Sequence, residues 1–241
     1  MTKTTLVILP TFNERSNLER IVDEVLSTKL TVDLLIVDDN SPDGTGELAQ
    51  ALAAQHPDRI YVLHRTVKAG LGAAYLAGFL WALTQGYEYV VEMDADGSHH
   101  PDELSTLLEP AYSGADLVIG TRWMPGGTVR NWSLARRAIS RFGTWYASNA
   151  LRLPLRDLTS GYRVLSLRLV EKILESGIQS AGYGFQIEVA LLAHDQHLTI
   201  VERPITFTER LGGQSKMSKA IVVEAWWKTT TWSLQRMLNR R

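Results

Sequence analysis

Short apolar runs alternate with amphipathic stretches along the first half of the chain. The runs occupy residues 5–9, 34–37, 60–63, 89–93 and 117–119. They are rich in β-branched and aromatic residues, which is typical of buried strands. The stretches between them, at residues 16–28, 45–55, 71–84 and 101–112, have the pattern of helices. This alternation predicts βαβ units and a mostly parallel sheet.

The second half of the chain has a different pattern, which begins near Trp123. Longer helical stretches and loops predominate there, with a helix predicted at residues 132–151 and one late strand at 198–207. No repeat or low-complexity linker separates the two halves. We therefore predict an α/β fold, a mostly parallel sheet flanked by helices, in a single domain over residues 1–241.

Polar residues follow four of the predicted strands. These clusters occupy residues 10–14, 38–44, 94–96 and 120–122. The carboxyl ends of parallel strands meet at one edge of a sheet, where open α/β sheets bind their ligands. Solvated loops are also polar, and for any single cluster this is the favoured explanation. Four clusters together predict a binding site at this edge.

The third cluster contains two carboxylates two residues apart, Asp94 and Asp96. Side chains at this spacing on an extended segment share a face. Mg²⁺ and Mn²⁺ prefer hard oxygen ligands, and Mg²⁺ is often held by one or two carboxylates plus substrate phosphates. The pair therefore favours a metal-diphosphate site. A polar turn before a helix that begins at Pro101 explains the same residues, so both interpretations remain open on the spacing alone.

A nucleotide needs a platform for its base, a partner for its ribose and a counter-charge for its phosphates. The cluster at 10–14 with Asp38 and Asp39 can supply the first two. Residues 68–74 open a helix, whose free N–H groups attract anions. Tyr75 stands where a dinucleotide-binding fingerprint has its third glycine, which disfavours a dehydrogenase. Contact with phosphate and a plain glycine-rich helix start fit this segment equally.

Composition excludes several classes of function. The chain has 241 residues, 45% of them hydrophobic, and a formal net charge of -1 with a pI near 6.6, which argues against general nucleic-acid binding. It has no cysteine, which excludes disulfides, thiolate metal sites and a cysteine nucleophile, and fits an intracellular protein. No apolar run approaches the roughly 18 residues of a membrane span. We expect a soluble or peripheral protein.

Several segments together carry a family resemblance: PTFNE, VDDNSPDGTG, KAGLGAAY, MDADGSHHP, GTRW, DLTSGYR, GYGFQIE and PITFTERLGGQSK. With them the chain resembles the inverting family 2 glycosyltransferases, which have the Rossmann-like GT-A fold. Within that family it is similar to the polyprenol-phosphate (dolichol-phosphate) mannosyltransferases. The resemblance covers most of the chain and implies a nucleotide-sugar half at residues 1–122 and an acceptor half at 123–241.

The resemblance implies GDP-mannose as the donor. The residues implied for the nucleotide sugar are Pro10, Thr11, Asn13, Glu14, Val37, Asp38, Asp39, Lys68, Gly70, Asp94, Ala95, Asp96, Arg122, Arg210 and Lys216. Mg²⁺ or Mn²⁺ is implied at Asp94, Asp96 and Ser98. Many members of the family have glutamine where this chain has Ser98, and a hydroxyl is a weaker metal ligand than that side chain.

The same resemblance implies a polyprenyl phosphate as the acceptor. Its phosphate is expected to meet Arg122, Arg136, Ser140, Arg141 and Ser215, and the catalytic residues are expected to be Asp96, Arg122 and Arg136. The 157–163 segment resembles the acceptor-side wall. Because a phosphate acceptor is already ionised, we expect inversion without a protein general base. Two alternatives remain: a related polyprenyl-phosphate transferase that uses UDP-glucose or another nucleotide sugar, and a noncatalytic nucleotide-sugar-binding scaffold.

Basic and aromatic residues suggest contact with a membrane. Arg130, Arg137 and Arg141 are spaced to share one face of the predicted helix at 132–151, and the C-terminal region carries Trp226, Trp227 and Trp232. Such amphipathic helices can rest on anionic lipid. An ordinary surface helix and core packing are the competing explanations. We expect peripheral contact with the cytoplasmic face of a membrane, with a membrane-anchoring subunit as a candidate partner.

Overall fold

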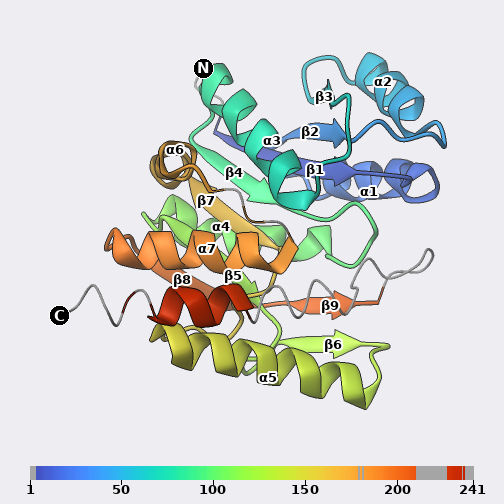
Figure 1. The fold of residues 1–241 in the computed structure, drawn as a ribbon. Coiled ribbons are helices and arrows are strands. Elements are labelled where there is room, and N and C mark those ends of the chain that lie inside the picture. Colours follow the sequence, from blue (N-terminus) through green and yellow to red (C-terminus); the bar gives the residue numbers. More distant parts are fainter. Residues whose placement is uncertain (1–3, 179, 181, 210–226, 235, 237–241) are drawn as a thin grey trace.

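A seven-stranded sheet forms the centre of the computed structural model, which describes residues 4–178, 180, 182–209, 227–234 and 236. The strand order is β3-β2-β1-β4-β7-β5-β8 (Figure 1). The strands of this sheet are β1 (Thr5–Thr11), β2 (Asp33–Asp38), β3 (Ile60–His64), β4 (Tyr89–Glu92), β5 (Leu117–Thr121), β7 (Arg163–Ser166) and β8 (Ile200–Pro204). A second described sheet pairs β6 (Thr128–Arg130) with β9 (Thr206–Thr208).

The central sheet is mostly parallel, as the alternating pattern predicts. β3, β2, β1 and β4 run parallel, whereas β7 is antiparallel to both of its neighbours, β4 and β5. Two antiparallel pairings in succession give β5 the same direction as β4. The sequence pattern did not predict β6 or β7. The single strand expected at residues 198–207 is wrong, because β8 and β9 belong to different sheets.

Helices flank the sheet as expected. They are α1 (Arg15–Ser27), α2 (Thr45–Gln55), α3 (Leu71–Gln85), the 3₁₀ turn η1 (Pro101–Glu103), α4 (Leu104–Tyr112), α5 (Leu134–Leu151), α6 (Leu167–Ser176) and α7 (Gly182–Asp195). The Ser133 hydroxyl accepts a hydrogen bond from the Arg136 N–H and caps α5. Arg130 therefore precedes this helix. Its predicted place on one face of α5 is wrong, because it belongs to β6.

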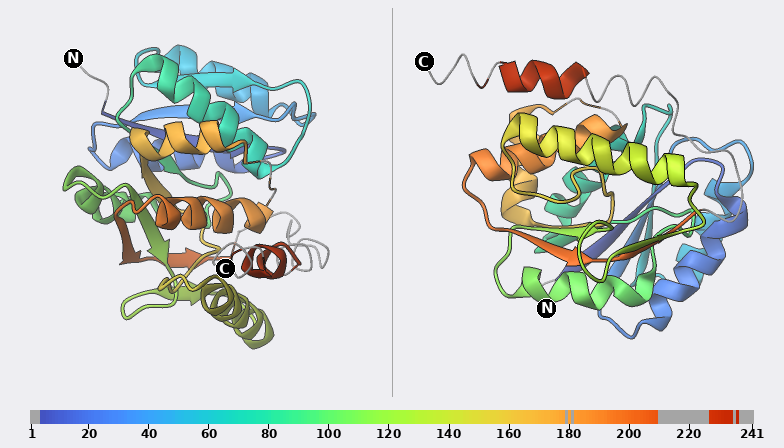
Figure 2. Two further views of the ribbon diagram at one scale, coloured as in Figure 1. Left: turned by 60° about the vertical axis from the view of Figure 1, so that its left-hand side comes forward. Right: turned by 90° about the horizontal axis from the view of Figure 1, so that it is seen from below.

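Alternate strand residues pack into two apolar layers. Leu6 and Ile8 pack into the layer that contains Phe79 of α3, and Val7 packs with Leu18 of α1 on the opposite face. Because successive side chains of a strand point to opposite faces, one apolar strand serves both layers. The result is a sheet between two layers of helices, with α3, α6 and α7 on one face and α1, α2 and α4 on the other (Figure 2).

Arg163 fixes the antiparallel strand β7 from the inside. This side chain is fully buried and donates hydrogen bonds to the backbone oxygens of Leu158 at 2.9 Å, Ser160 at 2.8 Å and Gln186 at 2.7 Å. Burial of a guanidinium is costly unless its donors are satisfied. These bonds connect the 157–162 loop to α7, so one arginine holds together two segments that are remote in sequence.

We expect Arg163→Met to lower the free energy of unfolding by about 3 kcal/mol, because three buried carbonyl groups lose their donor. Urea denaturation followed by circular dichroism measures this change. The control is Arg168→Met on the exposed face of α6, where we expect a change within about 0.5 kcal/mol. Equal denaturation midpoints for the two variants would contradict the assigned role of Arg163.

Candidate active site

The polar clusters meet at one edge of the sheet. Thr11 pairs with Asp38 in the β1–β2 register, the Asp39 N–H donates to the Thr11 carbonyl at 3.0 Å, and Met93 donates to Ile8. The carboxyl ends of β1, β2 and β4 are therefore neighbours. Residues of the predicted donor site that lie along this edge are Pro10, Thr11, Asn13, Glu14, Val37, Asp38, Asp39, Asp94, Ala95 and Asp96.

The two aspartates after β2 have different surroundings. The Asp38 carboxylate accepts hydrogen bonds from the Thr11 hydroxyl and from the N–H and hydroxyl of Ser41. Asp39 forms an ion pair with Arg65 at 2.6 Å, and burial raises the pKa of its carboxyl although Arg65 opposes this effect. Asp38 thus shapes the turn, whereas Asp39 and Arg65 place a charged pair beside it.

Arg65 was missed by the sequence analysis, although it directly follows β3. The rule that identified the other strand ends would have found it. Nearby, the Lys68 ammonium lies 3.7 Å from the centre of the Phe12 ring, so the predicted residue Lys68 contacts the aromatic residue of the predicted 10–14 cluster. Phe12 is half-buried and lies between Thr11 and the exposed Asn13. It supplies an aromatic face at the donor edge.

Two glycines at the start of α3 have different structural reasons. Gly70 precedes the helix with φ +91°, a conformation that favours glycine. A Cβ on Gly72 would lie 2.6 Å from the Ser180 carbonyl oxygen and 3.0 Å from Phe185. Close packing therefore requires glycine at position 72 without any ligand, whereas Gly70 remains a predicted contact of the donor.

The loop that carries Asp94 and Asp96 is held by its own backbone. The Ser98 N–H donates to the Asp96 carboxylate at 3.0 Å, and the Asp94 N–H donates to Nδ1 of His99 at 3.0 Å. Gly97 has φ +77°, which completes the turn. Burial lowers the pKa of His99 to about 3, so its ring is neutral and can accept the Asp94 N–H.

The oxygen atoms of this loop fit a hard divalent cation. Asp96 is buried, Asp94 is half-buried, and the buried Ser98 hydroxyl has no hydrogen-bond partner among the described residues. In the described part of the chain, no three His, Cys, Asp or Glu side chains gather into a group that could hold a metal ion. Two carboxylates and an orphaned hydroxyl suit Mg²⁺ or Mn²⁺ when a diphosphate supplies further oxygens.

Arg122, at the end of β5, is held by Asp157. Its Nε and Nη2 donate to the two Asp157 oxygens at 2.7 and 2.8 Å, and Nη2 also donates to the Thr159 hydroxyl at 2.9 Å. Both charged side chains are nearly fully buried. A bidentate pair of this kind fixes the orientation of the guanidinium plane. The 157–163 segment, expected as an acceptor-side wall, thus supplies the partner of a predicted catalytic residue.

Three aromatic side chains, Trp123, Trp132 and Phe207, form a cluster around which the predicted acceptor arginines gather. The Arg122 guanidinium carbon lies 5.4 Å from the ring centres of Trp132 and Phe207. Arg136 lies 4.2 Å over Trp132, and Arg141 lies 5.8 Å from Trp123. Arginine on aromatic faces is stabilised by cation–π attraction. Arg122 directly follows β5, and Arg136 and Arg141 lie on α5.

Other predicted acceptor residues are placed less fully. Ser140 lies on α5 one turn after Arg136, whose guanidinium also pairs with Glu209. Arg210, Ser215 and Lys216 lie outside the described residues. Their predicted contacts with the donor and the acceptor phosphate stay predictions.

Comparisons with known proteins give this geometry a family. The model of glycosyl transferase family 2 matches residues 6–174. A polyprenol monophosphomannose synthase of Mycolicibacterium smegmatis is 52% identical over 99% of this chain and 90% of its own length. An undecaprenyl-phosphate mannosyltransferase of Micrococcus luteus is 48% identical, with 95% and 93% covered. The chain belongs to glycosyltransferase family 2.

Solved structures confirm the expected GT-A fold of this glycosyltransferase. Glucosyl-3-phosphoglycerate synthase of Mycobacterium tuberculosis superimposes with a TM-score of 0.72 at 21% identity, and the match covers 96% of this chain and 80% of that one. That structure contains Mn²⁺, UDP-glucose and phosphoglyceric acid. At this identity the likeness establishes the fold alone.

A buried polar network lies beneath the carboxylates of the glycosyltransferase. Glu92, two residues before Asp94, is fully buried and accepts a hydrogen bond from Gln186 at 2.8 Å. Burial raises the pKa of Glu92 to about 7. Burial also raises the pKa of Tyr75, and the nearby charges of Asp94 and Glu92 act in the same direction. Burial thus disfavours the ionised form of both acids below the site.

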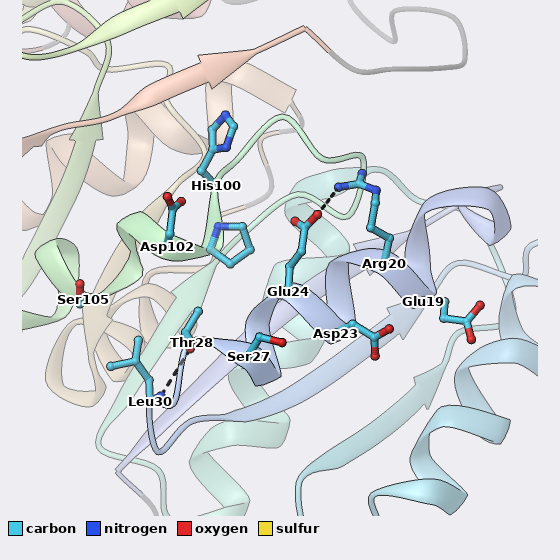
Figure 3. A pocket seen from close by; sticks show the side chains of 11 residues that line it. Glu19, Arg20, Asp23, Glu24, Ser27, Thr28, Leu30, His100, Asp102 and Ser105 are labelled. Carbon is cyan, nitrogen blue, oxygen red and sulfur yellow. Dashed lines mark hydrogen bonds and ion pairs between the residues drawn. The ribbon is translucent and has the colours of Figure 1, made fainter.

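A cavity of about 870 Å³ lies beside the site and contains none of the predicted site residues. One wall comes from α1, with Glu19, Asp23 and Glu24, and another contains His100 and Asp102 (Figure 3). The cavity is therefore separate from the edge where the donor residues gather.

Glu92→Gln tests the buried acid through the pH dependence of stability. An unfolded glutamate has a pKa near 4.5 and folded Glu92 near 7, so only the folded state keeps this proton between those values. The stabilisation from protonated Glu92 is complete below pH 4.5 and is lost as the pH rises to 7. We expect the variant to gain stability relative to the parent from pH 5 to pH 8, by up to about 3 kcal/mol.

Urea denaturation of both proteins at several pH values measures this difference. His99, whose pKa is lowered, adds stability with rising pH up to about 6.5, but this contribution is common to both proteins and cancels. A difference that stays constant from pH 5 to pH 8 would contradict the raised pKa of Glu92.

Proposed function

We propose that the chain transfers mannose from GDP-mannose to a polyprenyl monophosphate with inversion, giving a polyprenyl β-mannosyl phosphate. The observation that carries this proposal is the arrangement of Asp94 and Asp96 at the same sheet edge as Arg122, with Arg136 on the adjoining aromatic cluster. Transfer from a sugar diphosphate to a phosphate brings two anionic groups together. It therefore needs carboxylates that hold a metal cation at the diphosphate and arginines at the acceptor phosphate. The relatives from Mycolicibacterium and Micrococcus, named for polyprenol and undecaprenyl phosphate mannosyl transfer, support the choice of sugar and acceptor.

We propose that residues 1–122 hold the donor. Asp39 and Arg65 offer an acceptor and a donor group side by side for the base and ribose, and Phe12 offers an aromatic face. Asp94, Asp96 and Ser98 would hold Mg²⁺ or Mn²⁺. When bound, the metal supplies positive charge to the diphosphate that leaves with the nucleoside.

Residues 123–241, with Arg122, form the acceptor half in this proposal. Arg136 would bind the acceptor phosphate, since a guanidinium can hold two phosphate oxygens and is oriented here by the Trp132 face. Arg122, whose guanidinium plane is fixed by its ion pair with Asp157, would lie beside it as an oriented hydrogen-bond donor. The acceptor is ionised near neutral pH, so direct attack needs no general base and inverts the sugar carbon. Ser140, Arg141, Arg210, Ser215 and Lys216 complete the proposed set.

The lipid tail needs an apolar surface close to the site. On α5 the side chains of Leu134, Ile139, Phe142 and Trp145 are 81%, 51%, 49% and 60% exposed. The C-terminal helix (residues 227–234) lies beside α5, joined by the Tyr146–Thr230 hydrogen bond of 2.7 Å, and it exposes Trp227 and Leu234 (Figures 1 and 2). Trp226 lies outside the described residues, and Trp232 packs against the core.

This exposed surface supports peripheral docking to the cytoplasmic face of a membrane, with an anchoring subunit as a further partner. Among the described residues, no helix is both long and apolar enough to cross a bilayer. Large contiguous apolar patches rimmed by basic residues mark lipid or protein contacts. Arg137 and Arg141 on α5 provide the basic rim.

We expect purified protein with Mg²⁺ or Mn²⁺ and a short polyprenyl phosphate to form mannosyl-phospholipid from GDP-mannose, detected by mass spectrometry. Asp96→Ala should lower the rate at least about 100-fold, because the metal that binds the diphosphate loses one of its carboxylate ligands. Asp102→Asn, in the separate cavity, is the matched control and should retain activity. Product from UDP-glucose instead would establish the alternative transferase, and no product from any donor would favour a nucleotide-sugar-binding scaffold.

Phe142 and Trp145 test the membrane surface. The double variant Phe142→Ser/Trp145→Ser should reduce cosedimentation with vesicles of anionic phospholipid at least about fivefold, since two large apolar groups no longer enter the bilayer. Leu80→Ser changes a residue that is 56% exposed on α3, away from this surface, and should leave cosedimentation unchanged. Equal sedimentation of the two variants would remove α5 from the proposed docking surface.

A further inference from the structure

The peptide group of Asp94 has a buried side-chain partner that the proposed chemistry does not use. Its N–H donates to Nδ1 of His99 at 3.0 Å, five residues further along the loop. His99 is 1% exposed, and its Nε2 has no hydrogen-bond partner among the described residues. The described hydrogen bonding of this ring therefore consists of a single acceptor bond to the Asp94 backbone.

Aromatic packing fixes the position of this acceptor. The His99 ring stacks on Tyr162, with ring centres 4.8 Å apart and planes inclined by 20°. Phe207 meets the same ring edge-on at 5.5 Å and 80°. The Tyr162 hydroxyl also donates to the His100 carbonyl at 3.2 Å. The imidazole is thus held by Tyr162, directly before β7, and by Phe207 of β9, which are both remote from it in sequence.

The same strand β9 binds the loop on either side of His99. The Thr208 N–H donates to the Ser98 carbonyl at 3.1 Å, and the Thr208 hydroxyl bonds to Nε2 of His100 at 2.8 Å. Phe207 also contacts Trp132, which underlies Arg136. His99 consequently contacts, through Phe207, the aromatic cluster on which the acceptor arginines pack.

We propose that His99 is a positioning residue: its Nδ1 fixes the Asp94 peptide and thereby aims the Asp94 and Asp96 carboxylates at a metal-bound nucleoside diphosphate, while its ring ties this loop to the aromatic cluster. This inference rests on the proposed function for the ligand of the loop.

The physical reason is the rigidity of a peptide plane. An N–H buried without an acceptor is unfavourable, so the Asp94 peptide rotates if Nδ1 is removed, and the Asp94 side chain rotates with it. The orientation of the Asp94 carboxylate relative to Asp96 then changes. Groups that orient metal ligands typically change metal affinity by about 10- to 100-fold when they are removed.

Three substitutions distinguish the effect of the Nδ1 hydrogen bond from the effect of the ring packing. His99→Phe keeps an aromatic ring against Tyr162 and Phe207 but removes the acceptor. His99→Asn places an amide oxygen close to the position of Nδ1, whereas His99→Gln places its oxygen near Nε2. Binding of Mn²⁺–GDP, Mn²⁺–UDP and metal-free GDP is measured by calorimetry, together with the thermal midpoint and the kcat and KM for mannosyl transfer.

We expect His99→Phe to weaken Mn²⁺–GDP binding about 10- to 100-fold and metal-free GDP binding less than about threefold. His99→Asn should restore Mn²⁺–GDP affinity to within about fivefold of the parent, and His99→Gln should not. If His99→Phe does not fold, the difference in Mn²⁺–GDP affinity between His99→Asn and His99→Gln tests the proposal. Parent-like Mn²⁺–GDP binding by His99→Phe, or equal affinities for Asn and Gln, would overturn the proposal.

The parent protein separates this inference from the proposed function. If the parent binds Mn²⁺–UDP and not Mn²⁺–GDP, the proposed donor is wrong, and the three variants are compared with Mn²⁺–UDP under the same criteria. If the parent binds neither nucleotide in the presence of metal, both the proposed function and the role of His99 are overturned.

Discussion

The buried ion pair between Arg122 and Asp157 connects the two halves of the site. It joins the carboxyl end of β5 to the loop that precedes β7, and both side chains are almost completely removed from water. Ionised groups are costly to bury, so each partner depends on the other and on the exact geometry of the bidentate contact. Because Arg163 holds the other end of the same loop through backbone carbonyls, β7, α7 and the site share one polar framework.

Charge is distributed unevenly across this framework. The donor edge presents Asp39, Asp94 and Asp96, whereas the adjoining aromatic cluster presents Arg122 and Arg136. A metal ion at the donor edge would meet negative charge, and an anionic acceptor at the aromatic cluster would meet positive charge. Aromatic faces beneath the arginines keep the guanidinium groups ordered, together with their carboxylate partners Asp157 and Glu209. The site thus places oriented arginines beside a group of aspartates, and the metal ion of a metal-bound diphosphate would supply the positive charge that these aspartates lack.

The site residues found from sequence are those that obey a local rule. Asp38, Asp39, Asp94 and Asp96 follow apolar strands, and strand ends of one direction must gather at one edge. The same rule extends to Arg65, which was overlooked. Phe12 also obeys it, since it directly follows β1 in the predicted 10–14 cluster. Trp132 and Phe207 follow no such rule, because the value of an aromatic ring depends on which cation packs against it. The sequence resemblance suggested a role for the DLTSGYR segment, but it did not indicate that Asp157 would pair with Arg122.

The sequence by itself determined the alternation of strands and helices, the polar strand ends and the family, since these depend on periodicity and on residues that are neighbours in the chain. Tertiary structure decided the insertion of β7 between β4 and β5, the division of the late strand into β8 and β9, and the exclusion of Arg130 from α5. It also decided the partner of Arg122. The physical reason is that pairing and burial join residues far apart in sequence, and their energies depend on distances that no local pattern contains.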